Sequence, residues 1–407
     1  MSETVKNRGW AVAFAGLSIN LALGILYTWS IFKNEISKGG VFNWDPASIN
    51  DPYAVACLVF AFAMILAGKV QDKFGPKITA FIGGLFVGIG FIWISQTTSY
   101  LTWVLGFGVL AGIGIGFGYS SATPPALKWF PAAKTGLIAG IVVSGFGLAS
   151  VYIAPLSNYL IKLWGIHSTM MFFGIAFLVI VSLLSLLLIN PPAGFIPGGV
   201  KSDNTKNVST QTDFNASHMM KQHSFYILWL IYFIGAGAGL MVIGSVAGMA
   251  QKSMGEYAFL VVATMAVGNA GGRIVAGLLS DKIGRRTTLA IMLGFQALLM
   301  FIAIPIVGAE DTHAVVLVIL AILIGFNYGT NLSLFPSYTK DLWGLKNFGT
   351  NYGIIFTAWG VGGFTLSRIS QMIKAETGSF TYSFIAAGSL LIVGVLLTFI
   401  IHRKPSI

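Results

Sequence analysis

Charged side chains are scarce in this chain of 407 residues, where Asp, Glu, Lys and Arg together make up only 9%. An ordinary soluble domain carries roughly 25%. The mean hydropathy of +0.81 leaves too little polar area to cover a soluble surface. The low charge therefore excludes the two or three soluble domains that the length alone would suggest.

Residues that carry catalysis or bind cofactors are also few. The single cysteine, Cys57, lies inside an apolar stretch, so no disulfide forms within the chain and a buried packing role is expected. The five histidines lie outside the apolar centres. No Cys/His cluster offers metal ligands, and no Gly-rich loop with a following Lys-Ser/Thr offers a phosphate site. The sequence thus predicts no enzyme, no cofactor and no metal.

Long apolar stretches dominate the chain instead. Crossing a bilayer takes about 20 apolar residues, and twelve stretches come close to that length. They cover residues 10–31, 53–68, 78–97, 101–127, 136–161, 166–189, 224–250, 256–279, 287–308, 313–339, 348–373 and 379–402. The 50 glycines suit close packing between membrane helices. We therefore predict an all-α membrane protein with twelve transmembrane helices.

The surplus of positive charge, +11, follows the predicted topology. With both termini cytoplasmic, 17 of the 24 Lys and Arg lie in cytoplasmic segments, five lie outside and two lie within spans. The outer five are Lys33, Lys38, Lys162, Lys252 and Lys374, and the two within spans are Arg273 and Arg368. This bias is the positive-inside rule. It predicts a multi-pass protein of the cell membrane, and it accounts for the basic charge without nucleic acid.

One long polar stretch, residues 190–223, divides the chain. We interpret it as a flexible cytoplasmic linker between an N-terminal six-helix half, residues 1–189, and a C-terminal six-helix half, residues 224–407.

The two halves contain matching segments. Residues 68–77 read GKVQDKFGPK, and residues 277–286 read GLLSDKIGRR. Their aspartates are 209 positions apart, and the same offset superimposes residues 115–119 on residues 324–328. Two matches at one offset indicate an internal repeat. Parallel repeats of six helices indicate a transporter whose solute site lies between the halves near the midplane.

The two loops resemble the loop motif of the major facilitator superfamily. The resemblance covers essentially the whole chain and implies two six-helix halves related by pseudo-twofold symmetry, working by alternating access. We expect the gating residues Asp72, Gly75, Asp281 and Arg285 to control the cytoplasmic gate, because an aspartate at a helix end pairs with nearby bases or a helix N-terminus.

Arg273 is the most informative residue. A charge near the centre of a span costs about 2.5–3.5 kcal/mol on insertion scales, so it is retained where it faces a cavity or a partner. Arg273 lies eight residues before Asp281, about 12 Å along the helix. Apart from Glu256, the first residue of one span, no acidic residue lies in any predicted span. We therefore expect a substrate carboxylate as its partner. Arg368, nearer an outer helix end, is either an interface anchor or a vestibule residue.

Further polar and aromatic residues are candidates for the substrate site. Asn269 lies one turn from Arg273 on the same face. Tyr119 and Tyr328 occupy equivalent places in the two repeats. With Tyr27 and Trp359, they complete the predicted substrate-binding set.

Three segments narrow the resemblance further. Residues 129–131 (WFP), 269–273 (NAGGR) and 351–353 (NYG) are similar to the oxalate/formate exchangers and to the monocarboxylate transporters for lactate and pyruvate. In both groups an arginine in span eight binds the substrate carboxylate, and Arg273 matches that position. The resemblance thus implies a small carboxylate as substrate.

Two departures from these families refine the prediction. The oxalate exchangers carry a second cation, a lysine, where this chain has Trp359. One cation balances one carboxylate, so a monocarboxylate such as lactate or pyruvate is favoured over a dianion. The animal monocarboxylate transporters carry a proton-coupling aspartate where this chain has Asn269, which does not titrate. We favour proton-linked symport, with an oxalate/formate-type exchanger as the alternative.

Two other classes of protein remain as rivals. A membrane sensor of organic acids would need a signalling domain, and the linker carries none that we recognise. A membrane enzyme would need a catalytic set. We expect a carrier that works as a monomer in the bilayer, with a carboxylate and a proton as its partners.

Overall fold

The computed structural model describes residues 7–38, 40–131, 134–192, 195, 213–307, 313–344 and 346–401. The described part is helical and contains no strand. Its α-helices are α1 Gly9–Leu23, α2 Trp29–Ser37, α3 Asp51–Phe74, α4 Pro76–Ile94, α5 Tyr100–Trp103, α6 Gly112–Trp129, α7 Thr135–Ser185, α8 Ala216–Met219, α9 His223–Ile243, α10 Val246–Met254, α11 Phe259–Ile283, α12 Arg285–Val307, α13 Ala314–Trp343, α14 Phe348–Thr377 and α15 Thr381–Thr398. Short 3-10 turns, Gly24–Thr28 and Gly255–Ala258, and the π-helical Val104–Ala111 link some of them.

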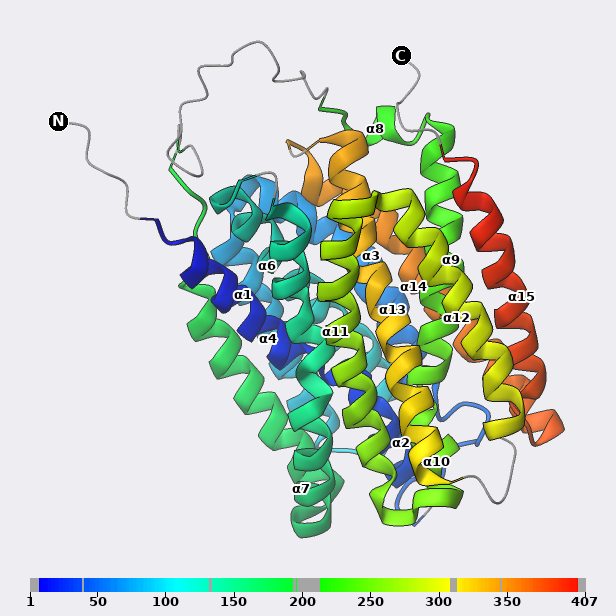
Figure 1. The fold of residues 1–407 in the computed structure, drawn as a ribbon. Helices are drawn as coiled ribbons and strands as arrows, with labels where there is room; N and C mark the ends of the chain where they lie inside the picture. The colour runs from blue at the N-terminus through cyan, green and yellow to red at the C-terminus, as the bar shows by residue number, and fades with distance from the viewer. Residues whose placement is uncertain are drawn as a thin grey trace.

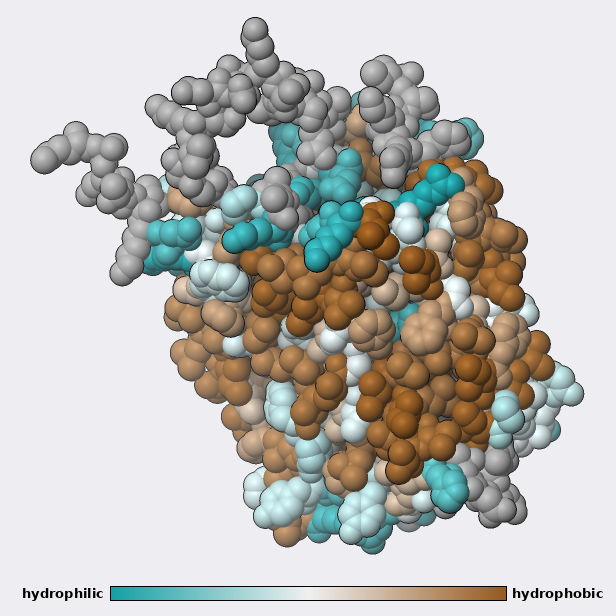
Figure 2. Space-filling model, viewed as in Figure 1, coloured by the Kyte–Doolittle hydropathy of each residue, from teal (hydrophilic) through white to brown (hydrophobic). Residues whose placement is uncertain are grey.

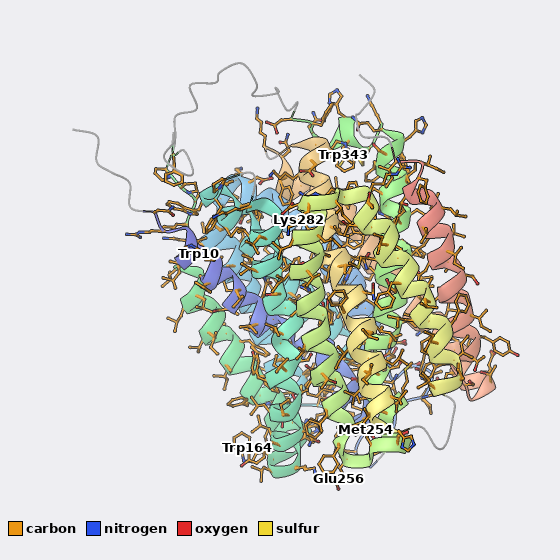
Figure 3. The ribbon with its side chains drawn as sticks, viewed as in Figure 1. Trp10, Trp164, Met254, Glu256, Lys282 and Trp343 are labelled. Carbon is orange, nitrogen blue, oxygen red and sulfur yellow. The ribbon has the colours of Figure 1, made fainter. Side chains whose placement is uncertain are left out.

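Ten helical stretches of the described part are long and apolar enough to cross a membrane. Apolar side chains form a broad band around the middle of the molecule, and polar ones gather toward its two ends (Figure 2). The exposed rings of Trp10 and Trp164 lie toward opposite ends (Figure 3), as expected of tryptophans at membrane interfaces. The chain is a multi-pass membrane protein.

Two of the predicted spans share one helix. Residues 136–161 and 166–189 both fall largely in α7, whose 51 residues are interrupted at Gly165 by a non-helical conformation, φ +74°. Figure 1 shows the two stretches of α7 meeting at one end of the molecule. The predicted span 348–373 lies in α14, a helix of 30 residues that is too polar to count among the ten.

The loop repeat recurs in the backbone. Gly75 follows α3 with φ +83°, and Gly284 follows α11 with φ +89°. These glycines are 209 positions apart, and a left-handed conformation of this kind favours glycine. The same turn thus leads from α3 into α4 and from α11 into α12.

Close backbone contact holds α11 against α13. A Cβ atom on Gly272 would lie 1.8 Å from the carbonyl oxygen of Phe326, and one on Gly329 would lie 2.0 Å from the carbonyl oxygen of Asn269. Small residues let membrane helices approach this closely. The register between these two helices is therefore fixed at the level of the candidate site.

Residues 213–222 of the predicted linker are described, and they contact the C-terminal helices. Asn215 caps α8 by accepting a hydrogen bond from the His218 backbone N–H at 3.0 Å. The backbone N–H of Phe214 donates to the Trp343 carbonyl at 3.1 Å, and Asn351 donates to the Phe214 carbonyl at 2.9 Å. Residues 193–194 and 196–212 lie outside the described residues.

The glycine contacts predict an asymmetric response to alanine at two adjacent positions. Gly272→Ala forces a methyl group into the Phe326 carbonyl, and overpacking of this kind costs about 1–3 kcal/mol. Gly271→Ala meets nothing closer than 3.9 Å, so it should be neutral or slightly stabilising. We expect a lower melting temperature in detergent for Gly272→Ala alone. Equal melting temperatures for the two variants would contradict the described packing.

Candidate functional site

Arg273 lies in the middle of α11 with its side chain fully buried. Its Nε donates a hydrogen bond to Asn269 Oδ1 at 2.9 Å, one turn earlier on the same helix. Nη1 donates to the Val143 carbonyl of α7, and Nη2 donates to the Tyr27 hydroxyl at 3.5 Å. The guanidinium therefore links the C-terminal helices (α9–α15) to the N-terminal helices (α1–α7).

Glycines of α7 leave room for this side chain. A Cβ on Gly147 would lie 3.3 Å from Arg273 Nε, and one on Gly140 would lie 3.0 Å from the Arg273 carbonyl oxygen. Larger residues at these positions would push α7 away from α11. The small residues of α7 thus allow the guanidinium to reach the Val143 carbonyl.

All three hydrogen-bond partners of Arg273 are uncharged. The described part contains five ion pairs, and none of them involves this residue. A guanidinium has five N–H donors, and the three bonds use three of them. The charge and the spare donors suit a small anion, and a carboxylate matches them in shape. Within the described ranges, no group of His, Cys, Asp and Glu gathers to hold a metal ion.

Tyr27 lies in a break of the first membrane-spanning helix. α1 ends at Leu23, and the chain runs as the 3-10 segment Gly24–Thr28 before α2 begins. Gly24 permits this break to press against α7, because a Cβ there would lie 2.5 Å from the Phe146 carbonyl oxygen. A 3-10 stretch inside a helix often marks a hinge. The break carries Tyr27 into the interface between the two sets of helices.

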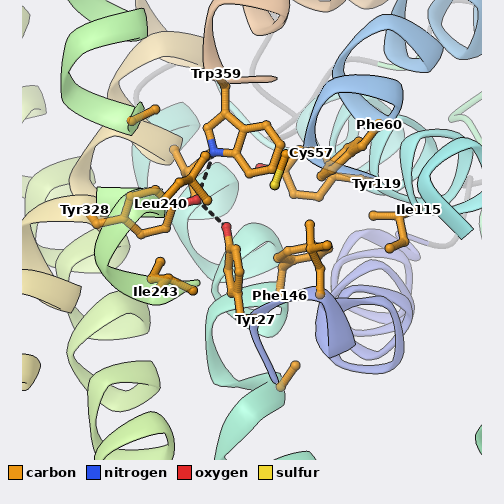
Figure 4. Packing of buried hydrophobic residues seen from close by; sticks show 14 of the residues in the cluster. Tyr27, Cys57, Phe60, Ile115, Tyr119, Phe146, Leu240, Ile243, Tyr328 and Trp359 are labelled. Atoms are coloured by element: carbon orange, nitrogen blue, oxygen red, sulfur yellow. Dashed lines mark hydrogen bonds between the residues drawn. The ribbon is translucent and has the colours of Figure 1, made fainter. Parts of the chain in front are cut away.

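Tyr27 is bonded to Tyr328 of the C-terminal helices, and Tyr328 in turn is bonded to Trp359. The Tyr27 hydroxyl lies 2.5 Å from that of Tyr328 on α13, and Trp359 Nε1 of α14 donates to Tyr328 at 2.8 Å. Figure 4 shows both polar groups pointing at the Tyr328 hydroxyl. The structure therefore joins five of the predicted substrate-binding residues, Arg273, Asn269, Tyr27, Tyr328 and Trp359, in one network.

Tyr119 stands apart from that network. Its ring packs edge-on against Phe60 and Phe146, with centroids 5.5 Å apart in each case, and lies 5.6 Å from Phe356. Its buried hydroxyl has no hydrogen bond within the described part. Tyr119 and Tyr328 match in sequence offset, but only Tyr328 is tied to the guanidinium through Tyr27.

Three phenylalanines that sequence reasoning missed connect the predicted residues. Phe60, Phe146 and Phe356 each contact Tyr119, and Phe60 and Phe356 also pack on Trp359 at about 5 Å. With 31 phenylalanines in the chain, no sequence signal distinguishes these three. They form a continuous apolar wall beside the polar network.

A small pocket adjoins the network on the side of α10. It is bounded by Tyr27 and Ser150 of the N-terminal helices and Asn269 of α11. Its remaining lining is apolar and consists of Ile243, Val246, Val262, Met265 and Ala266. Three polar and five apolar residues thus line a space of about 10 Å³, which is large enough for part of a small molecule only.

The two loop aspartates lie at equivalent places at one end of the bundle. Asp72 accepts a hydrogen bond from Thr350 Oγ1 at 3.3 Å, in the first turn of α14. A Cβ on Gly136, in the first turn of α7, would lie 2.6 Å from Asp281 Oδ2. Each carboxylate thus faces the N-terminus of a helix from the other set, where a negative charge is stabilised.

Arg285 reinforces one of these contacts. Its Nη1 donates to Asp281 Oδ1 at 2.6 Å, and its Nε donates to Asp341 Oδ2 at 2.9 Å. The position equivalent to Arg285 in the first repeat is Pro76. The two loops therefore share the aspartate and the glycine turn, while only the second has this arginine.

The opposite end of the bundle is also bridged. Arg368 of α14 forms an ion pair with Asp51 at the start of α3. Lys162 Nζ lies 2.9 Å from Glu256 Oε2. Both pairs join the N-terminal to the C-terminal helices. Sequence reasoning missed them because the paired residues are 317 and 94 positions apart.

Two sets of membrane helices that meet at a buried polar site are the architecture expected of a secondary transporter. The chain belongs to the Major Facilitator Superfamily, whose profile matches residues 9–367. This is a family of transporters, and the chain is not an enzyme.

Relatives agree with the sequence resemblance. The oxalate:formate antiporter of Oxalobacter formigenes is 27% identical over 402 residues, covering 98% of this chain and 92% of that protein. Human monocarboxylate transporter 11 is 25% identical over 395 residues, with 95% and 81% covered. YhjX of Escherichia coli K12, an uncharacterized MFS-type transporter, is 27% identical over 362 residues, with 87% and 85% covered. The predicted resemblance to both groups of carriers is confirmed.

Removing the hydroxyl of Tyr328 should destabilise the protein more than removing the hydroxyl of Tyr119. Tyr328→Phe leaves the buried Trp359 N–H without its acceptor, and an unsatisfied buried donor costs about 1–3 kcal/mol. Tyr119→Phe removes a hydroxyl that has no hydrogen bond within the described part. We expect a lower melting temperature in detergent for Tyr328→Phe and little change for Tyr119→Phe. A lower melting temperature for Tyr119→Phe than for Tyr328→Phe would contradict the described hydrogen bonds.

Proposed function

We propose that this protein is a secondary active transporter of small monocarboxylates such as lactate and pyruvate. The observation that carries the proposal is the buried guanidinium of Arg273, which has only uncharged partners in the described part. A carboxylate bound there would neutralise the charge and use the spare N–H donors.

The apolar surroundings support a monoanion with a short carbon chain. Arg273 is one cation, and Trp359, where the resembling oxalate exchangers carry a lysine, adds no charge. A dianion would leave a negative charge in a low dielectric, which is costly. The apolar residues that line the pocket beside Tyr27 and Asn269 would face the substrate's methyl group. In this proposal Tyr119 shapes the pocket through its wall of aromatic rings.

The membrane topology belongs to the same proposal. Counting α7 twice and adding α14 to the ten apolar stretches would bring the crossings to twelve. Six would form the half 1–189 and six the half 224–407, related by a pseudo-twofold axis. The positive-inside bias supports cytoplasmic termini and a place in the cell membrane, and we propose that the monomer is the working unit.

The loop contacts support a gating role. Asp72 at α14 and Asp281 at α7 hold the two sets of helices together at one end, with Arg285 fixing Asp281 and Gly75 shaping the turn. We propose that this is the cytoplasmic gate. Its contacts would have to part when the site opens to that side.

The partners of Arg273 bear on coupling. The Val143 carbonyl and the Tyr27 hydroxyl solvate the guanidinium from the opposite set of helices. Because these contacts tie the two sets of helices together, the empty carrier would have to break them to reorient. We place proton-linked symport first because the resemblance to the monocarboxylate transporters implies it. Exchange is the second candidate, because none of the bonded partners of Arg273 is an acid that carries a proton. One relative is itself named an antiporter.

Replacing the buried arginine should strongly weaken substrate binding. Arg273→Gln removes the charge and the bidentate fork, and we expect at least about 100-fold weaker pyruvate binding, equivalent to about 2.7 kcal/mol. Arg286→Gln is the matched control, because Arg286 stacks on Phe399 at the loop end. Binding is measured by equilibrium dialysis on protein that elutes as a single species. Unchanged affinity in Arg273→Gln would refute the assigned anchor.

Transport into liposomes should separate the two coupling modes. We expect labelled lactate uptake by the reconstituted protein to rise several-fold when the outside is made acidic. Preloading with unlabelled lactate serves as the comparison, because exchange needs a counter-substrate and symport does not. Acceleration by preloading with no response to the proton gradient would replace symport by exchange.

A further inference from the structure

An open cleft of about 430 Å³ lies at the end of the bundle away from Asp72 and Asp281. Two lysines, Lys33 of α2 and Lys374 of α14, line it together with uncharged residues that include Ser245, Gln251 and Gln371. No aspartate or glutamate lines the cleft. The cleft is therefore positively charged and is shared by both sets of helices.

Lys33 is nearly buried, with 9% of its surface exposed. Its Nζ donates to Ser245 Oγ at 3.3 Å and to Gln371 Oε1 at 3.1 Å, and both acceptors are neutral. Most lysines keep their charge in water, and a buried one is normally paired with an acid. Lys33 has no such pairing among the ion pairs of the described part.

Two other lysines at the same end are paired with glutamates. Lys38 pairs with Glu35 at 2.6 Å, and Lys162 pairs with Glu256 at 2.9 Å. Their side chains are 71% and 56% exposed. These two lysines are ordinary surface cations, so the uncompensated charge is specific to the cleft.

Lys374 adds a second positive charge. It follows Gln371 by three residues, hence on the same face of α14, and its Nζ lies 4.7 Å from the centre of the Phe380 ring. It forms no ion pair in the described part. Two cations on one partly shielded cavity raise the local concentration of anions.

The cleft lies next to the central site along the chain. Lys33 lies six residues beyond Tyr27, about 9 Å along a helix. Ser245, which bonds to Lys33, directly precedes Val246, which lines the small pocket beside Tyr27 and Asn269. The two sites are therefore neighbours along the first span and along the turn between α9 and α10.

We propose that Lys33 and Lys374 form a second anion-binding site, which takes the carboxylate of the incoming acid before it reaches Arg273. Lys33 now ties α2 to Ser245 and to Gln371 of α14. A carboxylate on Lys33 replaces these bonds, so docking also loosens the closure at this end. The identity of the anion rests on the proposed function, while the existence of the site rests on the cleft.

Sided transport kinetics test the docking role. In oriented proteoliposomes we expect Lys33→Gln to raise the KM for pyruvate about tenfold on the face where the cleft opens, since a charge-assisted hydrogen bond is lost. The KM on the other face should stay unchanged, and Lys33→Arg should restore the first. Lys38→Gln, with the same change in charge at the same end, is the control. Equal changes on both faces would reduce Lys33 to a structural contact and overturn the proposal.

A binding measurement separates this site from the central one. In an Arg273→Gln background, detergent-solubilised protein should still broaden the carbon-13 signal of carboxyl-labelled pyruvate. Adding Lys33→Gln should abolish that broadening, and adding Lys38→Gln should not. Loss of broadening with Arg273→Gln alone would overturn the second site. Broadening that depends on Lys33, in a protein that transports no monocarboxylate, would refute the proposed function and leave the second site standing.

Discussion

A permanently charged guanidinium inside an apolar bundle is the constraint on which the rest of the structure depends. Arg273 is fully buried, and a guanidinium group offers only donors and accepts no hydrogen bond. The protein therefore solvates it with fixed dipoles, which are the Asn269 amide, the Val143 carbonyl and the Tyr27 hydroxyl. Only one of these comes from its own helix, so the charge is stable only while α7 and the broken first span lie against α11.

Backbone proximity makes that arrangement possible. Gly272 and Gly329 bring α11 and α13 into contact, and Gly140 and Gly147 do the same for α7 and α11. Helices in a bilayer gain little from burying apolar surface against each other, so close backbone packing supplies much of their association. The same glycines that hold the bundle together therefore set the distance across which the guanidinium bonds. A substitution at one of these glycines therefore changes both the helix packing and the site.

Sequence reasoning found the features that are encoded locally. Apolar length predicted where the helices lie, one repeated offset predicted the matching turns at Gly75 and Gly284, and a lone charge in an apolar span singled out Arg273. It did not foresee the Tyr27–Tyr328 hydrogen bond, which joins residues 301 positions apart. An offset gives a residue's height on its helix but not the partner it faces, so Tyr119 and Tyr328 looked equivalent although their surroundings differ.

The loop contacts occur in both repeats, whereas the buried arginine occurs in only one. This difference suggests how binding and motion are linked. The loops place Asp72 and Asp281 alike on helices of the opposite set, whereas the position equivalent to Arg273 in the first repeat is Met64. One set thus supplies the charge, and the other supplies Val143 and Tyr27. In the proposed function, an anion on the spare N–H donors of Arg273 would neutralise the charge that attracts those two oxygens. Because they belong to the opposite set, binding would weaken the central contact between the sets, which is the contact that would have to change when access alternates.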